Sequence, residues 1–152
     1  MDSVREELIT RLTRSAVPSW AIRVVQLNSV VATRLGVTDT DVQCLHFLGQ
    51  QGPATPGTLA KRVNLTTGAA SRMIDRLVAA GCVRRVPDPA DRRRVLIEPT
   101  RDGLDRVTDA YAGLVARTME DLEEFTDGEL DVVLRFLDLA ERSTAAEAHR
   151  LR

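Results

Sequence analysis

The chain has 152 residues, 43% hydrophobic and 28% charged, so a single folded domain is expected and a disordered chain is excluded. No apolar run approaches the roughly 18 residues of a membrane span, and the polar N-terminus lacks a signal-peptide core, which predicts a cytoplasmic protein with no membrane partner. The 21 basic and 22 acidic residues leave a formal net charge of -1, which by itself argues against a nucleic-acid partner.

The distribution of the charge changes this interpretation. Residues 1–60 carry five basic and five acidic side chains, residues 61–101 carry ten and four, and residues 102–152 carry six and thirteen. A central segment of net charge +6 therefore stands beside a C-terminal segment of -7. A concentrated basic stretch is typical of a phosphate-binding surface, whatever the total charge.

Residues 1–36 predict two helical pieces. Leu8, Ile9 and Leu12 fit one or two amphipathic turns, after which Pro18 interrupts the helix and Ser19 can cap a new one. The apolar positions of the second piece recur at steps of three and four from Trp20 onwards, and Gly36 ends it: Val24, Leu27, Val31 and Leu35.

Two more helices are predicted between residues 37 and 64. The stretch Thr38–Asp41 starts a helix with an apolar face, and Gly52-Pro53 stops it. Thr55-Pro56 then opens a short helix, because proline is favoured at the first helical position. This helix breaks at Asn64, a residue that tolerates the left-handed conformation.

A third helix of this region follows after a tight turn. Thr66 or Thr67 caps it, it runs from about Gly68 to Ala80, and Gly81 is the expected stop. Two short helices joined in this way, the second with a small polar outer face, indicate a helix-turn-helix. The predicted inner face is Ala70, Met73, Ile74, Leu77 and Val78, and the outer face is Thr67, Gly68, Ser71, Arg72, Asp75 and Arg76.

The segment after the helix-turn-helix predicts a β-hairpin and then two long helices. Residues 82–86 and 94–98 have the pattern of strands around a turn at 87–91, and a hairpin in this place is a wing. Thr100 caps the first long helix, and Thr126 to Glu129 has capping-box spacing before the second. The last residues, from about Ala145, are expected to fray.

The stretches LTTGAASRMIDRL (65–77), AGCVRR (80–85) and DPADRRR (88–94) together resemble the MarR family of bacterial winged helix-turn-helix transcriptional regulators. The resemblance covers nearly the whole chain. It implies a mainly α fold with a small β-hairpin wing (α+β). Residues 37–99 would form the DNA-binding lobe, and residues 1–36 and 100–152 the dimerisation helices of the same structural unit.

The helix-turn-helix and the wing supply the candidate DNA contacts. Small residues let the N-terminus of this helix approach DNA. Arg72 and Arg76 either form bidentate hydrogen bonds with guanine or lie on a solvated face. Asp75, between them, could orient one of these arginines by a salt bridge. The resemblance implies that Asp91 anchors the wing tip and that Arg93 enters the minor groove. The predicted set is Thr66, Thr67, Gly68, Ser71, Arg72, Arg76, Arg84, Arg85, Asp91, Arg92, Arg93 and Arg94.

The terminal helices suggest a second copy of the chain as a partner. The C-terminal helix pair, with a net charge of -7 over residues 102–152, cannot lie against DNA, and its apolar stripes either form intrachain core or pack against another chain. The resemblance implies intertwined helices of two subunits, and a two-fold dimer would place two recognition helices roughly 34–36 Å apart on a palindromic site.

The resemblance also implies a small aromatic effector in a cavity lined by Trp20, Val24, His46, Phe47 and Tyr111, although Trp20 and Phe47 would equally suit the core. No cofactor, metal site or catalytic group is expected, because His46 and His149 lack zinc spacing with the cysteines and no nucleophile motif occurs. Cys44 and Cys82 are expected to be structural.

The sequence therefore predicts a ligand-responsive repressor that acts as a homodimer on double-stranded DNA. The alternative is a winged-helix protein-interaction module that no longer binds DNA. The pair Asp91 and Arg93 and the basic segment favour the first hypothesis.

Overall fold

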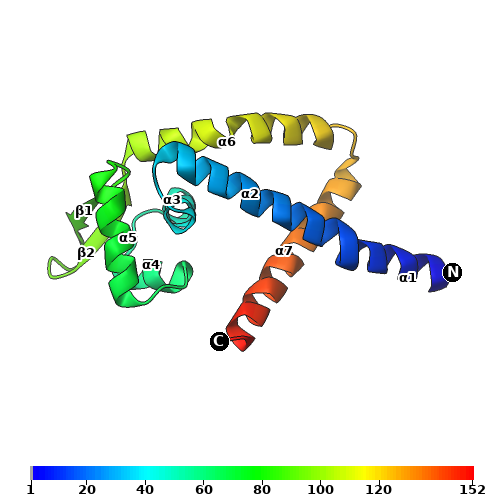
Figure 1. Ribbon diagram of the computed structural model, residues 1–152, viewed down its shortest axis with the longest axis horizontal. Helices are drawn as coiled ribbons and strands as arrows, with labels where there is room; N and C mark the ends of the chain where they lie inside the picture. Colours follow the sequence, from blue (N-terminus) through cyan, green and yellow to red (C-terminus); the bar gives the residue numbers. More distant parts are fainter. Residues whose placement is uncertain (1) are drawn as a thin grey trace. The chain divides into compact units, whose positions relative to one another are not determined.

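The computed structural model describes residues 2–152, and Figure 1 shows the order of their helices and strands. They fall into two compact units, the first ending at Tyr111 and the second running from Ala112 to Arg152, and each is described by itself. Within the described residues, no helix is both long and apolar enough to cross a membrane.

The first unit begins with one continuous helical stretch, in which α1 (Asp2–Arg11) passes through a π-helical segment, η1 (Leu12–Ala16), into α2 (Val17–Leu35). The predicted interruption at Pro18 is therefore wrong, and Ser19 caps nothing. In η1 the N–H of Val17 bonds to the carbonyl of Leu12, five residues back. This wider turn accommodates a proline ring that would clash with the preceding carbonyls of a regular α-helix.

Three helices of the first unit begin at a threonine, as the sequence predicts. Thr38 caps α3 (Asp39–Gln51), Thr55 caps α4 (Pro56–Arg62), and Thr66 caps α5 (Thr67–Ala79). Each hydroxyl accepts the backbone N–H of the residue three positions on, which satisfies one of the helix's free donors. Left-handed residues shape the turns: Gly36, Asn64 and Gly81 have φ between 56 and 72°.

The wing follows α5 as an antiparallel hairpin of β1 (Val83–Pro87) and β2 (Val95–Pro99). Val83 pairs with Pro99 and Pro87 with Val95. Ala54, in the connection before α4, exchanges both backbone hydrogen bonds with Ile97. The helix-turn-helix and the wing are thereby joined through β2.

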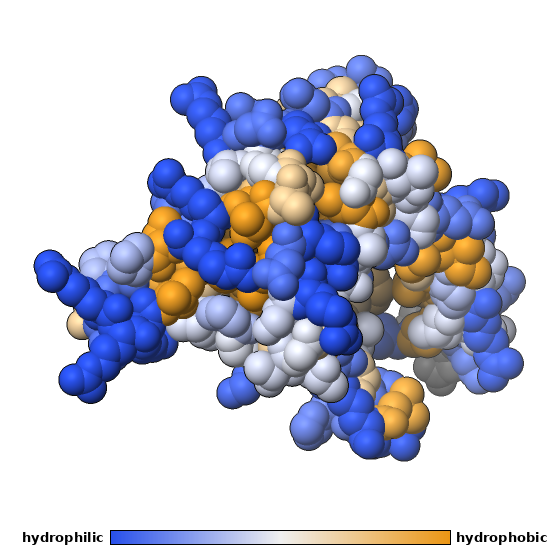
Figure 2. Space-filling view, turned by 60° about the vertical axis from the view of Figure 1, so that its left-hand side comes forward, coloured by the Kyte–Doolittle hydropathy of each residue, from blue (hydrophilic) through white to orange (hydrophobic). Residues whose placement is uncertain are grey.

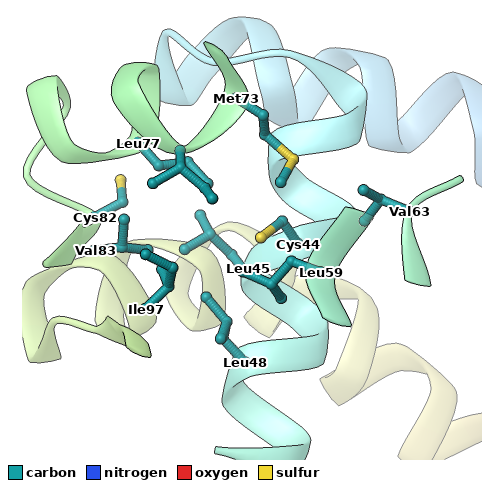
Figure 3. Packing of buried hydrophobic residues seen from close by; sticks show 11 residues of the cluster. Cys44, Leu45, Leu48, Leu59, Val63, Met73, Leu77, Cys82, Val83 and Ile97 are labelled. Atoms are coloured by element: carbon teal, nitrogen blue, oxygen red, sulfur yellow. The ribbon is translucent and has the colours of Figure 1, made fainter. Parts of the chain in front are cut away.

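One apolar cluster holds α3, α4, α5 and the wing together (Figure 3). Figure 3 shows the side chains of α3 between those of α4, those of α5 and those of the two strands. Val78, predicted on the inner face of α5, is instead exposed, because it lies at the edge of the buried stripe of that helix. The cluster comprises Cys44, Leu45, Leu48, Leu59, Val63, Met73, Ile74, Leu77, Cys82, Val83 and Ile97.

The helix α6 (Arg101–Leu122) begins at the end of the wing, and its first half belongs to the first unit. Thr100 caps it by accepting the N–H of Gly103 at 3.0 Å. A Cβ at Gly103 would lie 2.4 Å from the carbonyl oxygen of Cys82, so only glycine permits this close approach. Arg106 donates to the carbonyls of Ala80 and Leu35, at 3.0 and 3.1 Å, and so joins the ends of α5 and α2.

The second unit comprises the end of α6 and α7 (Asp127–Arg150). The predicted capping box is confirmed, because Thr126 and Glu129 bond each other's backbone N–H. The expected fraying from Ala145 is wrong: α7 stays helical to Arg150, whose guanidinium bonds to Glu147 one turn earlier. Large apolar side chains remain exposed along this unit, among them Leu114, Met119, Val132, Leu134, Phe136 and Leu137.

Candidate nucleic-acid interface

The N-terminal end of α5 presents small side chains and backbone outward. Thr66, Thr67, Gly68 and Ser71 are all exposed, as predicted for an outer face. Ser71 donates its hydroxyl to the carbonyl of Thr67 at 3.1 Å. A side chain added at Gly68 would meet no atom within 4 Å, so the packing of the chain does not require glycine there. This end of the helix can therefore approach another molecule closely.

The two arginines predicted to read bases from α5 have different surroundings. Arg76 donates Nε and one terminal nitrogen to the two oxygens of Asp41, at 3.2 and 2.8 Å. Arg72 is exposed, and within the described residues no carboxylate lies within 4.0 Å of its guanidinium. Arg72 is thus free to contact a ligand, whereas Arg76 is committed to a contact within the chain.

Asp41 is a site residue that the sequence analysis missed. It is completely buried, and it accepts the backbone N–H of Thr38 at 2.9 Å in addition to both hydrogen bonds from Arg76. These bonds fix the start of α3 against the last turn of α5, and the hydrogen bonds that Arg76 donates to the Asp41 carboxylate raise the pKa of Arg76. The spacing of Thr38 and Asp41 indicates a helix start in the sequence. The sequence does not indicate that Asp41 also pairs with Arg76, which lies 35 residues away.

The prediction that Asp75 orients Arg72 or Arg76 is wrong. Asp75 instead accepts a hydrogen bond from Arg85 of β1 at 2.6 Å, because helix α5 packs beside the first strand of the wing. The neighbouring Arg84 pairs across the hairpin with Glu98 at 2.9 Å. The Arg84 side chain stays largely exposed and that of Arg85 about half exposed, and both have donors left over for a further contact.

The tip of the wing, residues 88–94, is organised by two aspartates. Asp91 accepts the backbone N–H of Arg93 through its side chain at 3.0 Å and that of Arg94 through its carbonyl at 2.9 Å. Asp88, nearly buried, accepts the N–H of Ala90 at 2.9 Å. The resemblance implied a tip held by Asp91, and this geometry agrees with it.

The arginines of the tip project from this framework. Arg92 and Arg93 are exposed, and in the described part of the chain neither has a carboxylate within 4.0 Å. Arg94 has only a long contact of 3.8 Å to Asp88. Figure 2, in which the side bearing the wing is turned forward, shows extended hydrophilic side chains that project beyond the hydrophobic patches of the surface. The wing tip and α5 thus present unneutralised positive charge.

The five residues expected to line an effector cavity have separate surroundings. Trp20 is exposed in the single chain, so the alternative expectation that it is core is wrong for one chain alone. Tyr111 packs against Val31, Ala32 and Val42 of α2 and α3 and donates its hydroxyl to Asn28. Phe47 packs against the other cluster, the one shown in Figure 3.

The two remaining residues of that set are Val24 and His46. Val24 is half-buried on α2, and His46 is exposed with its ring edge-on to that of Phe47, the centroids being 6.2 Å apart. Phe47 and Tyr111 therefore belong to different apolar clusters.

Comparison with known proteins agrees with this architecture. A model of the MarR family matches residues 35–94, which extend from the end of α2 to the wing. The HTH-type transcriptional regulator YcgE of Bacillus subtilis is 34% identical over 151 residues, which cover 94% of this chain and 98% of that protein. The HTH-type transcriptional repressor YetL of the same organism is 33% identical over 89 residues, 58% of this chain and 53% of YetL.

The fold has a solved counterpart as well. The structure of a MarR family protein from Bacillus stearothermophilus superposes with a TM-score of 0.71 over 92% of this chain and 97% of that one, at 22% identity. The mainly helical fold with a two-stranded wing and long terminal helices is thus confirmed. This chain belongs to the MarR family of HTH-type transcriptional regulators, which bind DNA and are not enzymes.

Proposed function

We propose that this regulator binds a palindromic operator as a homodimer and represses transcription from it. The observation that carries the proposal is the set of arginines without a carboxylate partner among the described residues, Arg72 on α5 and Arg92 and Arg93 on the wing. The related YetL of Bacillus subtilis is a transcriptional repressor, which supports repression as the sign of regulation here. A response to a small molecule, which the family resemblance implies, is part of the same proposal.

In this proposal α5 lies in the major groove. Thr66, Thr67, Gly68 and Ser71 let its N-terminus approach the DNA backbone, where hydroxyls and backbone amides bond to phosphate. Arg72 is the candidate for a bidentate contact with guanine. Arg76 keeps the recognition helix in place through Asp41 and has only its remaining donors for DNA.

The wing supplies the second set of contacts. Arg93 follows the turn anchored by Asp91 and enters the minor groove, whose negative potential is concentrated where the groove is narrow. Arg92 and Arg94 beside it contact phosphates. Arg84 and Arg85 contact phosphates with the donors that their ion pairs leave free.

The exposed apolar side chains of the terminal helices support the dimer. Leu8, Ile9, Leu12 and Trp20 are each about half exposed or more in the first unit, and the second unit leaves a comparable set exposed on α6 and α7. Monomeric proteins rarely leave large patches of apolar side chains exposed, so a second copy of the chain is expected to cover these residues.

Fluorescence anisotropy with the DNA upstream of the protein's own gene tests the DNA-binding geometry. Arg93→Ala should weaken binding by at least ~1 kcal/mol, about fivefold, while circular dichroism shows an intact fold. Arg152→Ala removes one positive charge at the exposed C-terminus and should leave the affinity within about twofold. Equal affinity of Arg93→Ala and the parent would remove the wing from the mechanism, and no binding at low salt would overturn the whole proposal.

Light scattering after size exclusion tests the dimer, which should have twice the 16.8 kDa mass of the chain. Leu134→Glu places a charge on the exposed apolar side of α7 and should shift the protein toward the monomer. Ser143→Glu adds the same charge at an exposed polar position of the same helix and should leave the mass unchanged. A parent protein that is monomeric at all concentrations would contradict this part of the proposal.

A further inference from the structure

The start of α6 is fixed to the turn that follows the recognition helix α5. Thr100 donates its hydroxyl to the carbonyl of Gly81 at 2.7 Å and its backbone N–H to the carbonyl of Cys82 at 2.9 Å. Gly103 brings the backbone of α6 so close to the backbone of Cys82 that a Cβ would not fit. These residues all belong to the first unit. The first turn of α6 and the end of α5 are therefore held together through backbone contacts.

Arg106, one turn further along α6, reaches two helix ends at once. One terminal nitrogen of its guanidinium donates to the carbonyl of Ala80, the C-cap of α5, at 3.0 Å. The other donates to the carbonyl of Leu35, the last residue of α2, at 3.1 Å. The side chain is 34% exposed, and Asp102 makes only a long contact of 3.7 Å to it. One side chain of α6 thus joins the end of α5 to the end of α2.

The chemistry of the two helix ends favours an arginine at this position. The last four carbonyls of an α-helix have no donor within the helix, and the helix dipole favours a positive charge beside them. A guanidinium presents several N–H groups in a rigid planar fork, so it can give a separate nitrogen to each of two acceptors. A lysine offers one nitrogen in place of two. The fork of Arg106 therefore sets how the two helix ends lie relative to each other.

A second bond holds α2 to α6 but does not extend to α5. Tyr111 donates its hydroxyl to Asn28 at 2.6 Å, two turns before the end of α2. Among the side-chain hydrogen bonds of residues 2–152, those of Arg106 are the ones that reach both α2 and α5. The position of the recognition helix relative to α2 thus depends on this one guanidinium.

We propose that Arg106 is a positioning residue for DNA recognition, because it fixes α5 relative to α2 and thereby sets the separation of the two recognition helices in the dimer. This inference rests on the proposed function, in which the terminal helices pair with a second copy and α5 reads the DNA. Moving one half-site by a base pair shifts it by roughly 3.4 Å and turns it by roughly 34°. A fixed separation of the recognition helices is therefore measurable as a preference for one operator spacing.

Fluorescence anisotropy on the full chain tests this, with duplexes built on the palindrome that the parent protein selects from random-sequence DNA. One duplex carries the palindrome, a second has one base pair inserted at its centre, and a third keeps a single half-site. The parent should bind the second at least about tenfold more weakly than the first. In Arg106→Met this ratio should fall below about threefold, while the Kd for the single half-site stays within about twofold of the parent value. A reduced folded fraction would weaken all three complexes alike and could not produce this pattern.

Two further variants separate the fork from its charge. Arg106→Lys keeps the charge with one nitrogen and should give a ratio between those of the parent and Arg106→Met. Arg101→Met removes the same charge from the same helix, at a side chain that is 94% exposed, and should leave the ratio within about twofold of the parent value. Equal losses in Arg101→Met and Arg106→Met would overturn the inference.

The outcome for the parent separates this inference from the proposed function. A parent that binds both spacings equally would overturn the proposed dimeric recognition, and the inference would fall with it. If the parent discriminates between the spacings and Arg106→Met discriminates equally well, the proposed function stands and the role of Arg106 is refuted.

Discussion

The pair formed by Asp41 and Arg76 predicts an asymmetry between two substitutions. Arg76→Met leaves a carboxylate that is completely buried and keeps only the backbone N–H of Thr38 as a donor. Asp41→Asn leaves an arginine whose side chain is 46% exposed and can turn into water. Removing the half-exposed partner should therefore destabilise the protein more than removing the buried charge.

The magnitudes follow from what each variant leaves behind. A buried carboxylate without its ion-pair partner costs about 3 kcal/mol or more. In Asp41→Asn the solvated Arg76 costs little, and the loss is mainly the weakened start of α3, about 1 kcal/mol. We therefore expect the free energy of unfolding to fall about 2 kcal/mol further in Arg76→Met than in Asp41→Asn.

Urea unfolding followed by circular dichroism measures the difference, at one protein concentration because the unfolding of a dimer depends on it. Arg72→Met is the matched control, since Arg72 lies on the same helix without a carboxylate within 4.0 Å in the described residues; its effect should be within ~0.5 kcal/mol. The double variant of Asp41→Asn and Arg76→Met should be more stable than Arg76→Met alone. If Arg76→Met costs no more than Asp41→Asn or Arg72→Met, the reasoning is refuted.

Three further predictions concern the helix start of α7, the thiols and the junction of helices. Hydrogen bonds from Thr126 lower the pKa of Glu129, so its contribution to stability is present above the unfolded pKa of about 4.3 and is lost as the pH falls through the lower folded value. The Tm of Glu129→Gln should therefore fall less than the Tm of the parent between about pH 5 and pH 3, and an equal fall in both would contradict this prediction. Burial raises the pKa of Cys44 to about 12 and also raises the pKa of Cys82. A thiol reagent at neutral pH should therefore label both cysteines in urea and neither in the native protein. Rapid labelling of the native protein would contradict the burial of these thiols. Arg106→Met should lower the free energy of unfolding by about 1–3 kcal/mol, because the partly buried carbonyls of Ala80 and Leu35 lose their donor. A loss below about 0.5 kcal/mol in urea unfolding would show that these hydrogen bonds do not stabilise the protein.

The local elements were predictable because their signals act over a few residues. Thr55, Thr66, Thr100 and Thr126 each cap the helix expected from the sequence, and Gly81 has the positive φ expected after α5. A capping side chain accepts a backbone N–H three residues further along the chain, so the cap can be predicted from the local sequence alone. The failure at Pro18 has the same origin, because a proline is a local signal for a break, and only the π-helical turn before it removes the conflict.

The sequence by itself therefore determined that this protein is a winged helix-turn-helix regulator. It also determined that the positive charge is concentrated at the recognition helix α5 and the wing. Only the tertiary structure decided which of those charges are free. Arg76 is paired with Asp41, Arg85 with Asp75 and Arg84 with Glu98, whereas Arg72, Arg92 and Arg93 have no such partner in the described residues. The physical reason is that an ion pair needs two groups within about 4 Å. Packing, and not sequence spacing, brings residues 35 positions apart to that distance.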